Sequence, residues 1–388
     1  NQGPSSCSPV NGASGSSMKL PAVDVLRGLA ALGVAWFHSR VDLWVGYRAI
    51  QASPQTHTTL DRLLSLFSLP VSQLGGLVML FFVLSGFCIH LPNAASNHPT
   101  SLHLEVYGVR RFFRIVPAYL AALLFCLLAA VLLWRTGSAP LPDWHVYGAS
   151  ALLVQNWLLG GTQIALNPSL WSIPVEVEFY LVYPLLLWLW RRHGLGAAAG
   201  LTLLFTAFGF ALFAIGSPWA GTTFFAYALI WNAGAWLAEA FLQDRLPHWT
   251  SWFTLALFST LSLTLMGGLL GADPFWLHYG WGTVSFLLLL WVLGSGRAHF
   301  LPERTWLKPW VFIGTVSYSL YLLHFPLFKL AGAAWVAVYG AKPASFLVPT
   351  LATLLVIPFA WIFYRWIEWP THQLARQLGR SLQAAPPS

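Results

Sequence analysis

Charged residues are scarce in this sequence. Asp, Glu, Lys and Arg make up only 8% of its 388 residues, whereas 57% are hydrophobic. Soluble domains carry about a quarter charged residues, so this composition excludes an ordinary soluble domain. Cysteine is scarce as well: Cys7, Cys88 and Cys126 form neither a metal-ligand spacing nor a disulfide framework. What remains is a chain of long apolar runs, rich in Trp and Phe.

The apolar runs have the length of membrane-spanning helices. Roughly 20 apolar residues cross a bilayer as a helix, and the runs are separated by short polar breaks. We therefore expect an all-α, polytopic membrane helix bundle of about ten transmembrane helices. The expected spans lie near residues 22–44, 73–91, 113–134, 171–190, 195–215, 221–242, 250–270, 277–294, 310–330 and 344–365.

One further run, 146–160, is too short for a comfortable crossing and is expected to be interfacial or re-entrant. The basic residues decide this count, because cytoplasmic loops carry the excess of Lys and Arg. With ten spans, thirteen basic residues lie on the inner side and five outside; if 146–160 crosses, the ratio inverts. Both termini are therefore expected in the cytoplasm. The thirteen are Lys19, Arg110, Arg111, Arg114, Arg191, Arg192, Arg245, Arg297, Arg304, Lys308, Arg365, Arg376 and Arg380.

Three parts are expected along the chain. Residues 1–17 are rich in Ser, Gly and Pro and are predicted to be disordered. Residues 18–372 form the transmembrane domain, and residues 373–388 form a short basic cytoplasmic tail. We expect no cleavable signal peptide, internal repeat or appended soluble domain. The formal net charge of +8 is attributed to topology and lipid headgroup contact rather than to nucleic-acid binding.

The first span contains ionisable residues inside an apolar stretch, "RGLAALGVAWFH", which begins at Arg27 and ends at His38. Ionisable groups in a membrane are costly, so each is a functional-site hypothesis. The eleven-residue step between these two residues corresponds to about three full helical turns, to within roughly 20°. Both side chains therefore lie on one helix face, roughly 16 Å apart along the axis. Asp24 is spaced to pair with Arg27, and Asp42 to hold the ring of His38. Helix–helix hydrogen bonding within the bundle is the alternative for Asp24, Asp42 and His38.

Two later spans add polar groups at a similar depth. Glu176 lies in "WSIPVEVEFYLVYP" and His324 in "SYSLYLLHFP". Counted from the expected span ends, both lie at the level of His38, roughly 8–9 Å inside the outer boundary. A histidine positioned by a carboxylate is the usual arrangement for removing a proton from a hydroxyl. Glu178 points away from Glu176 and is expected to be structural.

A basic cluster begins the third span, where "RRFFRIVPAY" contains Arg110, Arg111 and Arg114. Guanidinium groups bind phosphates bidentately, and a helix N-terminus favours anions. Anchoring to anionic lipid is the alternative. In the second span, Ser85 precedes Gly86, which indicates close helix packing or approach of a ligand to the backbone.

Six stretches together resemble the integral-membrane acyltransferase-3 family. They are "VDVLRGLAALGVAWFH", "FFVLSGF", "RRFFRIVPAY", "WSIPVEVEFYLVYPLLL", "SYSLYLLHFPL" and "YRWIEWP", in the family's order. Two positions depart from the family pattern: Val177 stands where Glu or Gln is frequent, and Pro174 where Ser is common. Glu176 still falls on the acidic position of the family and is assigned its role.

The resemblance implies a multi-pass protein of the bacterial inner membrane. Such an enzyme moves an acyl group, usually acetyl, from cytoplasmic acyl-CoA to a hydroxyl of a carbohydrate or other envelope acceptor, without a metal. The arginine cluster would take the CoA phosphates, and Arg27 would hold the donor or polarise its thioester. His38 would act as the general base, oriented by Glu176 or Asp42, or become acylated itself.

The remaining predicted site residues would contact the acceptor or orient the catalytic groups. They are Asp24, Asp42, Ser85, Ser172, Tyr180, Tyr321 and His324. A proton-coupled transporter is the main alternative function, because interior ionisable residues also suit a carrier. A structural or lipid-binding membrane protein is a third, although it would not need a polar layer built from three spans.

Overall fold

The computed structural model describes residues 20–94, 103–158, 160–295 and 305–384, and these ranges contain helices and no strand. The tail predicted to be disordered, 1–17, lies outside the described residues. The long helices are α1 (Pro21–Leu43), α3 (Thr59–Val71), α4 (Val78–Ala94), α5 (Leu104–Arg135), α8 (Ser172–His193), α9 (Leu195–Ala214), α10 (Phe224–Leu242), α11 (Ser251–Leu269), α12 (Pro274–Gly294), α15 (Ser317–Tyr339), α16 (Leu347–Phe363) and α17 (Trp369–Ala384). The short helices are α2 (Tyr47–Ala52), α6 (Trp144–Ala151), α7 (Gln155–Leu158) and α14 (Lys308–Thr315).

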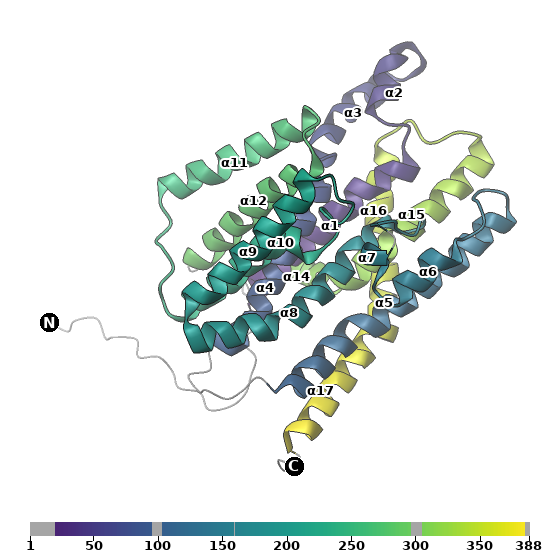
Figure 1. Ribbon diagram of the computed structural model, residues 1–388. Helices are drawn as coiled ribbons and strands as arrows, with labels where there is room; N and C mark the ends of the chain where they lie inside the picture. The colour runs from purple at the N-terminus through teal and green to yellow at the C-terminus, as the bar shows by residue number, and fades with distance from the viewer. Residues whose placement is uncertain (1–19, 95–102, 159, 296–304, 385–388) are drawn as a thin grey trace.

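Nine helical stretches of the described residues are long and apolar enough to cross a membrane. Helix α1 is not among them, since Asp24, Arg27 and His38 interrupt its apolar run. With 23 residues it nevertheless has the length of a span, and it runs through the middle of the bundle against α4, α14, α15 and α16 (Figure 1). The prediction of a polytopic helical membrane bundle is confirmed.

The last two expected spans have clearly different ends in the structure. The span expected at 310–330 is divided at Val316, where α14 ends and α15 begins, so the long helix is Ser317–Tyr339. The last span continues beyond residue 365 through a π-helical turn, Tyr364–Glu368, into α17. Hydropathy missed this continuation because α17 is amphipathic and packs along α5 rather than being apolar throughout.

The run 146–160 does not form one crossing helix. It is divided between α6 and α7 at Leu153, whose φ is +60°. Beyond this break the chain returns to the bundle at two places: Asn156 and Asn167 are fully buried and donate hydrogen bonds to backbone carbonyls. As a result α8 begins within the bundle, at the buried Ser172, and not at its surface.

Two glycines bring helices α4 and α10 into backbone contact. A Cβ on Gly86 would lie 1.9 Å from the carbonyl oxygen of Trp231, and one on Gly234 would lie 1.9 Å from that of Val83. Helices α4 and α10 can therefore approach only because both positions lack a side chain. Of the two readings of Gly86, the structure supports close helix packing.

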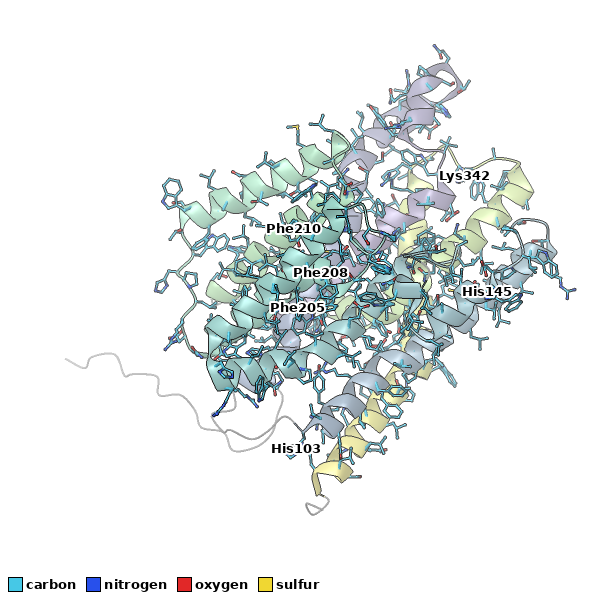
Figure 2. The ribbon with its side chains drawn as sticks, viewed as in Figure 1. His103, His145, Phe205, Phe208, Phe210 and Lys342 are labelled. Carbon is cyan, nitrogen blue, oxygen red and sulfur yellow. The ribbon has the colours of Figure 1, made fainter. Side chains whose placement is uncertain are left out.

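His103 and Lys342 mark opposite ends of the bundle (Figure 2). His103 precedes α5, beside the C-terminal end of α17, whereas Lys342 lies between α15 and α16. Following the charge-based topology, we refer to the end with His103 as the inner end and to the end with Lys342 as the outer end.

Candidate active site

Two cavities lie in the core of the bundle, and they share Val78 and Tyr321 in their walls. The inner cavity, of about 320 Å³, is lined by residues that include Arg27, Arg114 and Glu176. The outer cavity, of about 450 Å³, is lined by residues that include His38. Most of the predicted site residues are thus divided between two adjacent spaces.

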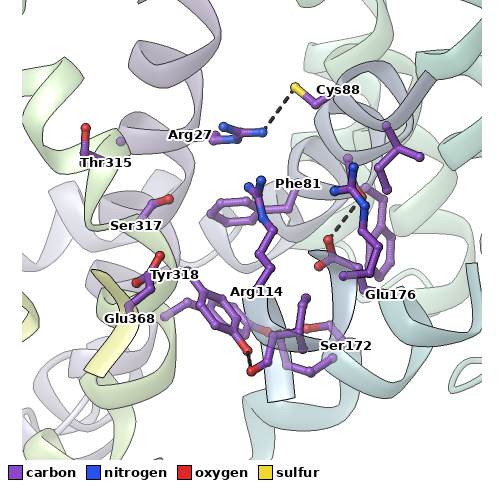
Figure 3. A pocket seen from close by; sticks show the side chains of 18 of the residues that line it. Arg27, Phe81, Cys88, Arg114, Ser172, Glu176, Thr315, Ser317, Tyr318 and Glu368 are labelled. Carbon is purple, nitrogen blue, oxygen red and sulfur yellow. Dashed lines mark hydrogen bonds between the residues drawn. The ribbon is translucent and has the colours of Figure 1, made fainter. Parts of the chain in front are cut away.

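Arg27, Arg114 and Glu176 enter the inner cavity from α1, α5 and α8 (Figure 3). Arg27 donates hydrogen bonds to Asp24 Oδ1 at 3.4 Å and to Cys88 Sγ at 3.1 Å. The predicted Asp24–Arg27 pair is confirmed. Together with the contact to Cys88, this pair orients the guanidinium toward the inner cavity.

Glu176 belongs to a hydrogen-bond network in the inner cavity. Its Oε1 accepts from Ser85 Oγ at 3.1 Å and from the hydroxyl of Tyr180. The expectation that Glu176 shares the level of His38 is wrong, since the two line different cavities. The depth count assumed that α8 starts at the outer surface, but α8 starts inside the bundle, so Glu176 lies deeper.

Two of the three clustered arginines face the inner cavity. Arg111 and Arg114 line it, and the guanidinium of Arg111 lies 5.5 Å from the ring centre of Tyr180. Arg110 is exposed and does not line the cavity; its Nε lies beside Gly379 of α17. The cluster therefore does not act as one surface.

Glu368 and His372 also line the inner cavity, although the sequence analysis assigned them no role. Ser319 Oγ donates to Glu368 Oε2 at 2.6 Å, and His372 Nε2 lies 3.8 Å from Glu368 Oε1. The π-helical turn and α17 thus supply part of the wall. The available signal was the carboxylate inside the quoted stretch "YRWIEWP".

His38 and His324 meet at the outer cavity. His38 Nδ1 lies 2.9 Å from His324 Nε2, and the two rings stack with centres 5.0 Å apart. This contact agrees with the depth expected for both residues. Asp42 does not hold His38 as predicted: it pairs with Lys329 of α15 at 3.6 Å, a partner that the spacing along α1 could not reveal.

The hydrogen bonds fix the tautomers of both neutral imidazoles. The carbonyl of Leu320 can only accept, so His324 Nδ1 carries the proton and donates to it at 3.1 Å. His324 Nε2 then accepts from His38 Nδ1–H. His38 Nε2 keeps a lone pair that no group in the described part of the chain engages, and this nitrogen is open to the outer cavity.

Tyr321 lies in the wall between the two cavities. Its hydroxyl donates to the Ser169 carbonyl at 2.5 Å and accepts from Ser172 Oγ at 2.7 Å. Its ring centre lies 5.7 Å from that of His324. Glu178, by contrast, accepts from the backbone N–H of Phe224 at the start of α10, so its predicted structural role is confirmed.

The sequence profile of the acyltransferase domain (Acyl_transf_3) matches residues 20–365. The chain belongs to this acyltransferase family. Among the described residues of the acyltransferase, no group of three or more His, Cys, Asp or Glu side chains could hold a metal ion.

Curated relatives of the acyltransferase agree with this assignment. It is 31% identical over 172 residues to "Acyltransferase MdmB" of Streptomyces mycarofaciens, covering 43% of this chain and 39% of the relative. It is 25% identical over 381 residues to a Staphylococcus aureus (strain COL) protein named "Putative O-acetyltransferase SACOL0978", covering 90% and 57%. It is 28% identical over 284 residues to "Peptidoglycan O-acetyltransferase OatA" of Listeria monocytogenes, covering 65% and 44%. The chain thus spans about half the length of these relatives. No solved structure matches it.

Proposed function

We propose that the protein is a membrane O-acetyltransferase that moves an acetyl group from cytoplasmic acetyl-CoA to a hydroxyl of an envelope carbohydrate at the bacterial inner membrane. The observation that carries the proposal is the pair of cavities that meet at Val78 and Tyr321. One is lined with arginines, and the other presents a free imidazole nitrogen. The acyltransferase family and the relatives named for O-acetylation support the same reaction.

The inner cavity suits the donor. Arg111 and Arg114 are available to the phosphates of the nucleotide, because guanidinium groups pair with phosphate oxygens bidentately. A space of about 320 Å³ favours the pantetheine arm, while the bulk of the nucleotide stays at the inner end. Arg27 lines this same cavity, which favours donor holding over action at the outer cavity.

The outer cavity suits the acceptor. His38 Nε2 removes the proton from the acceptor hydroxyl as its oxygen attacks the thioester carbonyl. The carbon–sulfur bond then breaks, and the CoA thiolate takes the proton back from His38, which leaves an acetyl ester and free CoA. The intermediate imidazolium is stabilised because its Nδ1–H donates to His324. Donor and acceptor would meet beside Tyr321, which lines both cavities.

Release of CoA thiol from acetyl-CoA by the purified protein in detergent tests the proposal. A slow rate without acceptor and a faster rate with one are expected, and a proton-coupled transporter would show neither. Mass spectrometry of envelope glycans should then show an acetyl group in cells that contain the protein and its absence in cells that lack it. Thiol release indistinguishable from that of buffer would contradict the proposed function.

A further inference from the structure

A second imidazole, His278 of α12, lines the outer cavity together with His38. Its Nδ1 lies 3.1 Å from the hydroxyl of Tyr227, and that hydroxyl donates to the Gly221 carbonyl at 2.7 Å. Because the Tyr227 proton is already used, His278 Nδ1–H must be the donor to the Tyr227 oxygen. The Nε2 of neutral His278 therefore keeps a lone pair with no partner among the described residues.

Gln163 adds a third free acceptor in the wall of the outer cavity. Its Nε2 donates to Asn156 Oδ1 at 2.8 Å and to the Gly161 carbonyl at 3.0 Å, so the amide orientation is fixed. Asn156 in turn uses its Nδ2 on two backbone carbonyls, so its oxygen must accept. The Oε1 of Gln163 is left buried without a donor. Native proteins rarely leave a buried oxygen unpaired, which points to a ligand donor.

His38 Nε2, His278 Nε2 and Gln163 Oε1 are all hydrogen-bond acceptors, so a ligand that engages them must supply the donors. Trp171 stacks on His278 with ring centres 5.9 Å apart, and Trp281 lines the same space, which provides flat apolar walls. No Asp, Glu, Lys or Arg lies among the described residues that line it. A charged group entering it would lose hydration without gaining a partner. This chemistry fits an uncharged ring that carries several hydroxyl groups.

We propose that His278, with Gln163, binds the acceptor hydroxyls that neighbour the acetylated one. The two residues thereby select an uncharged polyhydroxy ring and determine which of its hydroxyls reaches His38. The inference rests on the proposed function, in which His38 acts on the acceptor in this cavity. It assigns His278 to acceptor binding and not to donor binding or proton transfer.

The experiment compares His278→Asn with His278→Gln. The amide of Asn lies near the position of Nδ1 and can keep the hydrogen bond to Tyr227, but it has no acceptor atom at the position of Nε2. The longer side chain of Gln places its amide at the position of Nε2. CoA release from acetyl-CoA is measured with methyl α-D-glucopyranoside, its monodeoxy analogues, the corresponding uronate and cyclohexanol. Among these probes, the glucoside alone should accelerate release strongly, and at least one deoxy analogue should lose the acceleration.

His278→Asn should raise the KM for the glucoside by about tenfold or more, the effect of one lost hydrogen bond, and leave CoA release without acceptor unchanged. His278→Gln should stay closer to wild type. His145→Asn, at an exposed position, is the matched control. An unchanged KM, an equal loss of acceptor-free release, or equal acceleration by cyclohexanol or the uronate would overturn the inference. If the wild type releases CoA without acceptor but no glycoside accelerates the release, the inference is overturned while the use of acetyl-CoA as donor still stands. If the wild type releases no CoA at all, the proposed function itself is contradicted.

Discussion

His38 is the residue on which the proposed chemistry depends, because its Nε2 is the free base in the outer cavity. His38→Ala should lower acetyl transfer by about 10²–10⁴-fold, the usual cost of losing a general base. The protein should still purify as a monodisperse species, and the exposed His145→Ala should retain full activity. A His38→Ala enzyme with more than about a tenth of the wild-type rate would exclude the general-base role.

His324 is expected to act through His38 as a positioning residue. His324→Ala leaves His38 Nδ1–H without its acceptor, whereas the side-chain oxygen of His324→Gln can replace Nε2 as the acceptor. The Gln variant should therefore be about tenfold more active than the Ala variant, with equal KM for acetyl-CoA. Steady-state kinetics of both variants checks this. Equal activities, high or low, would mean that the ring only fills space.

The spacing of residues along single helices predicted part of this site. The three-residue step from Asp24 to Arg27 predicted their pair, and the depth count predicted that His38 and His324 share one level, where the structure shows them in contact. The same count failed for Glu176, because a buried segment before α8 shifts the start of that helix into the bundle. Such shifts depend on tertiary packing, which no local pattern encodes.

Other residues of the outer cavity carry little signal before the chain folds, although His278 lies at the start of the expected span 277–294. His278 and Gln163 are isolated polar residues in the sequence, and only folding brings them to the cavity of His38. Their free acceptor atoms follow from partners on distant segments, Tyr227 and Asn156. A resemblance to a known family identifies only residues within the shared motifs, and His278 and Gln163 lie outside the six stretches that resemble the family.

At the scale of helices, α5 separates the clustered arginines into different roles. Arg111→Ala and Arg114→Ala should each raise the KM for acetyl-CoA by about tenfold, because a charge-assisted hydrogen bond is lost. The exposed Arg110→Ala should change it by less than about threefold, since a surface charge contributes little. Salt should weaken donor binding by wild type through screening. Equal effects of all three substitutions would indicate that the three arginines anchor the protein to anionic lipid and do not bind the donor.

The close contact between α4 and α10 leads to a prediction about stability. A Cβ on Gly234 would lie 1.9 Å from the carbonyl oxygen of Val83, so Gly234→Ala must push the two helices apart. Overpacking of this kind costs about 1–3 kcal/mol, and the midpoint of thermal unfolding in detergent should fall. Gly196→Ala, where the added carbon meets nothing within 4 Å, should leave the midpoint unchanged or raise it. Equal midpoints for the two variants would show that α4 and α10 can move apart without loss of stability.

Hydropathy predicted most of the helices because burial in lipid requires long apolar runs. It could not place the break at Val316 or the continuation into α17, where the chain stays helical without staying apolar. It also left α3 out, although α3 and α4 form one helical stretch from Thr59 to Ala94. Helix ends are therefore set by contacts with neighbouring helices as well as by the membrane.

At the scale of the whole molecule, the two ends should face different compartments. In a variant with Cys7, Cys88 and Cys126 replaced by Ser, a single cysteine introduced by Arg192→Cys should react with an impermeant thiol reagent from the cytoplasm. One introduced by Lys342→Cys should react from outside, because the excess of basic residues lies at the inner end. Labelling of both positions from the same side would contradict the topology.

The central claim is that donor and acceptor reach one catalytic centre from opposite ends of the bundle. The most direct measurement uses sealed proteoliposomes of known orientation, with acetyl-CoA supplied on the side of Arg114 and the glycoside acceptor confined to the side of Lys342. The account predicts that the acetyl ester forms on the Lys342 side while CoA is released on the Arg114 side, and that His38→Ala abolishes both. Acetylation only when donor and acceptor share a side would contradict it.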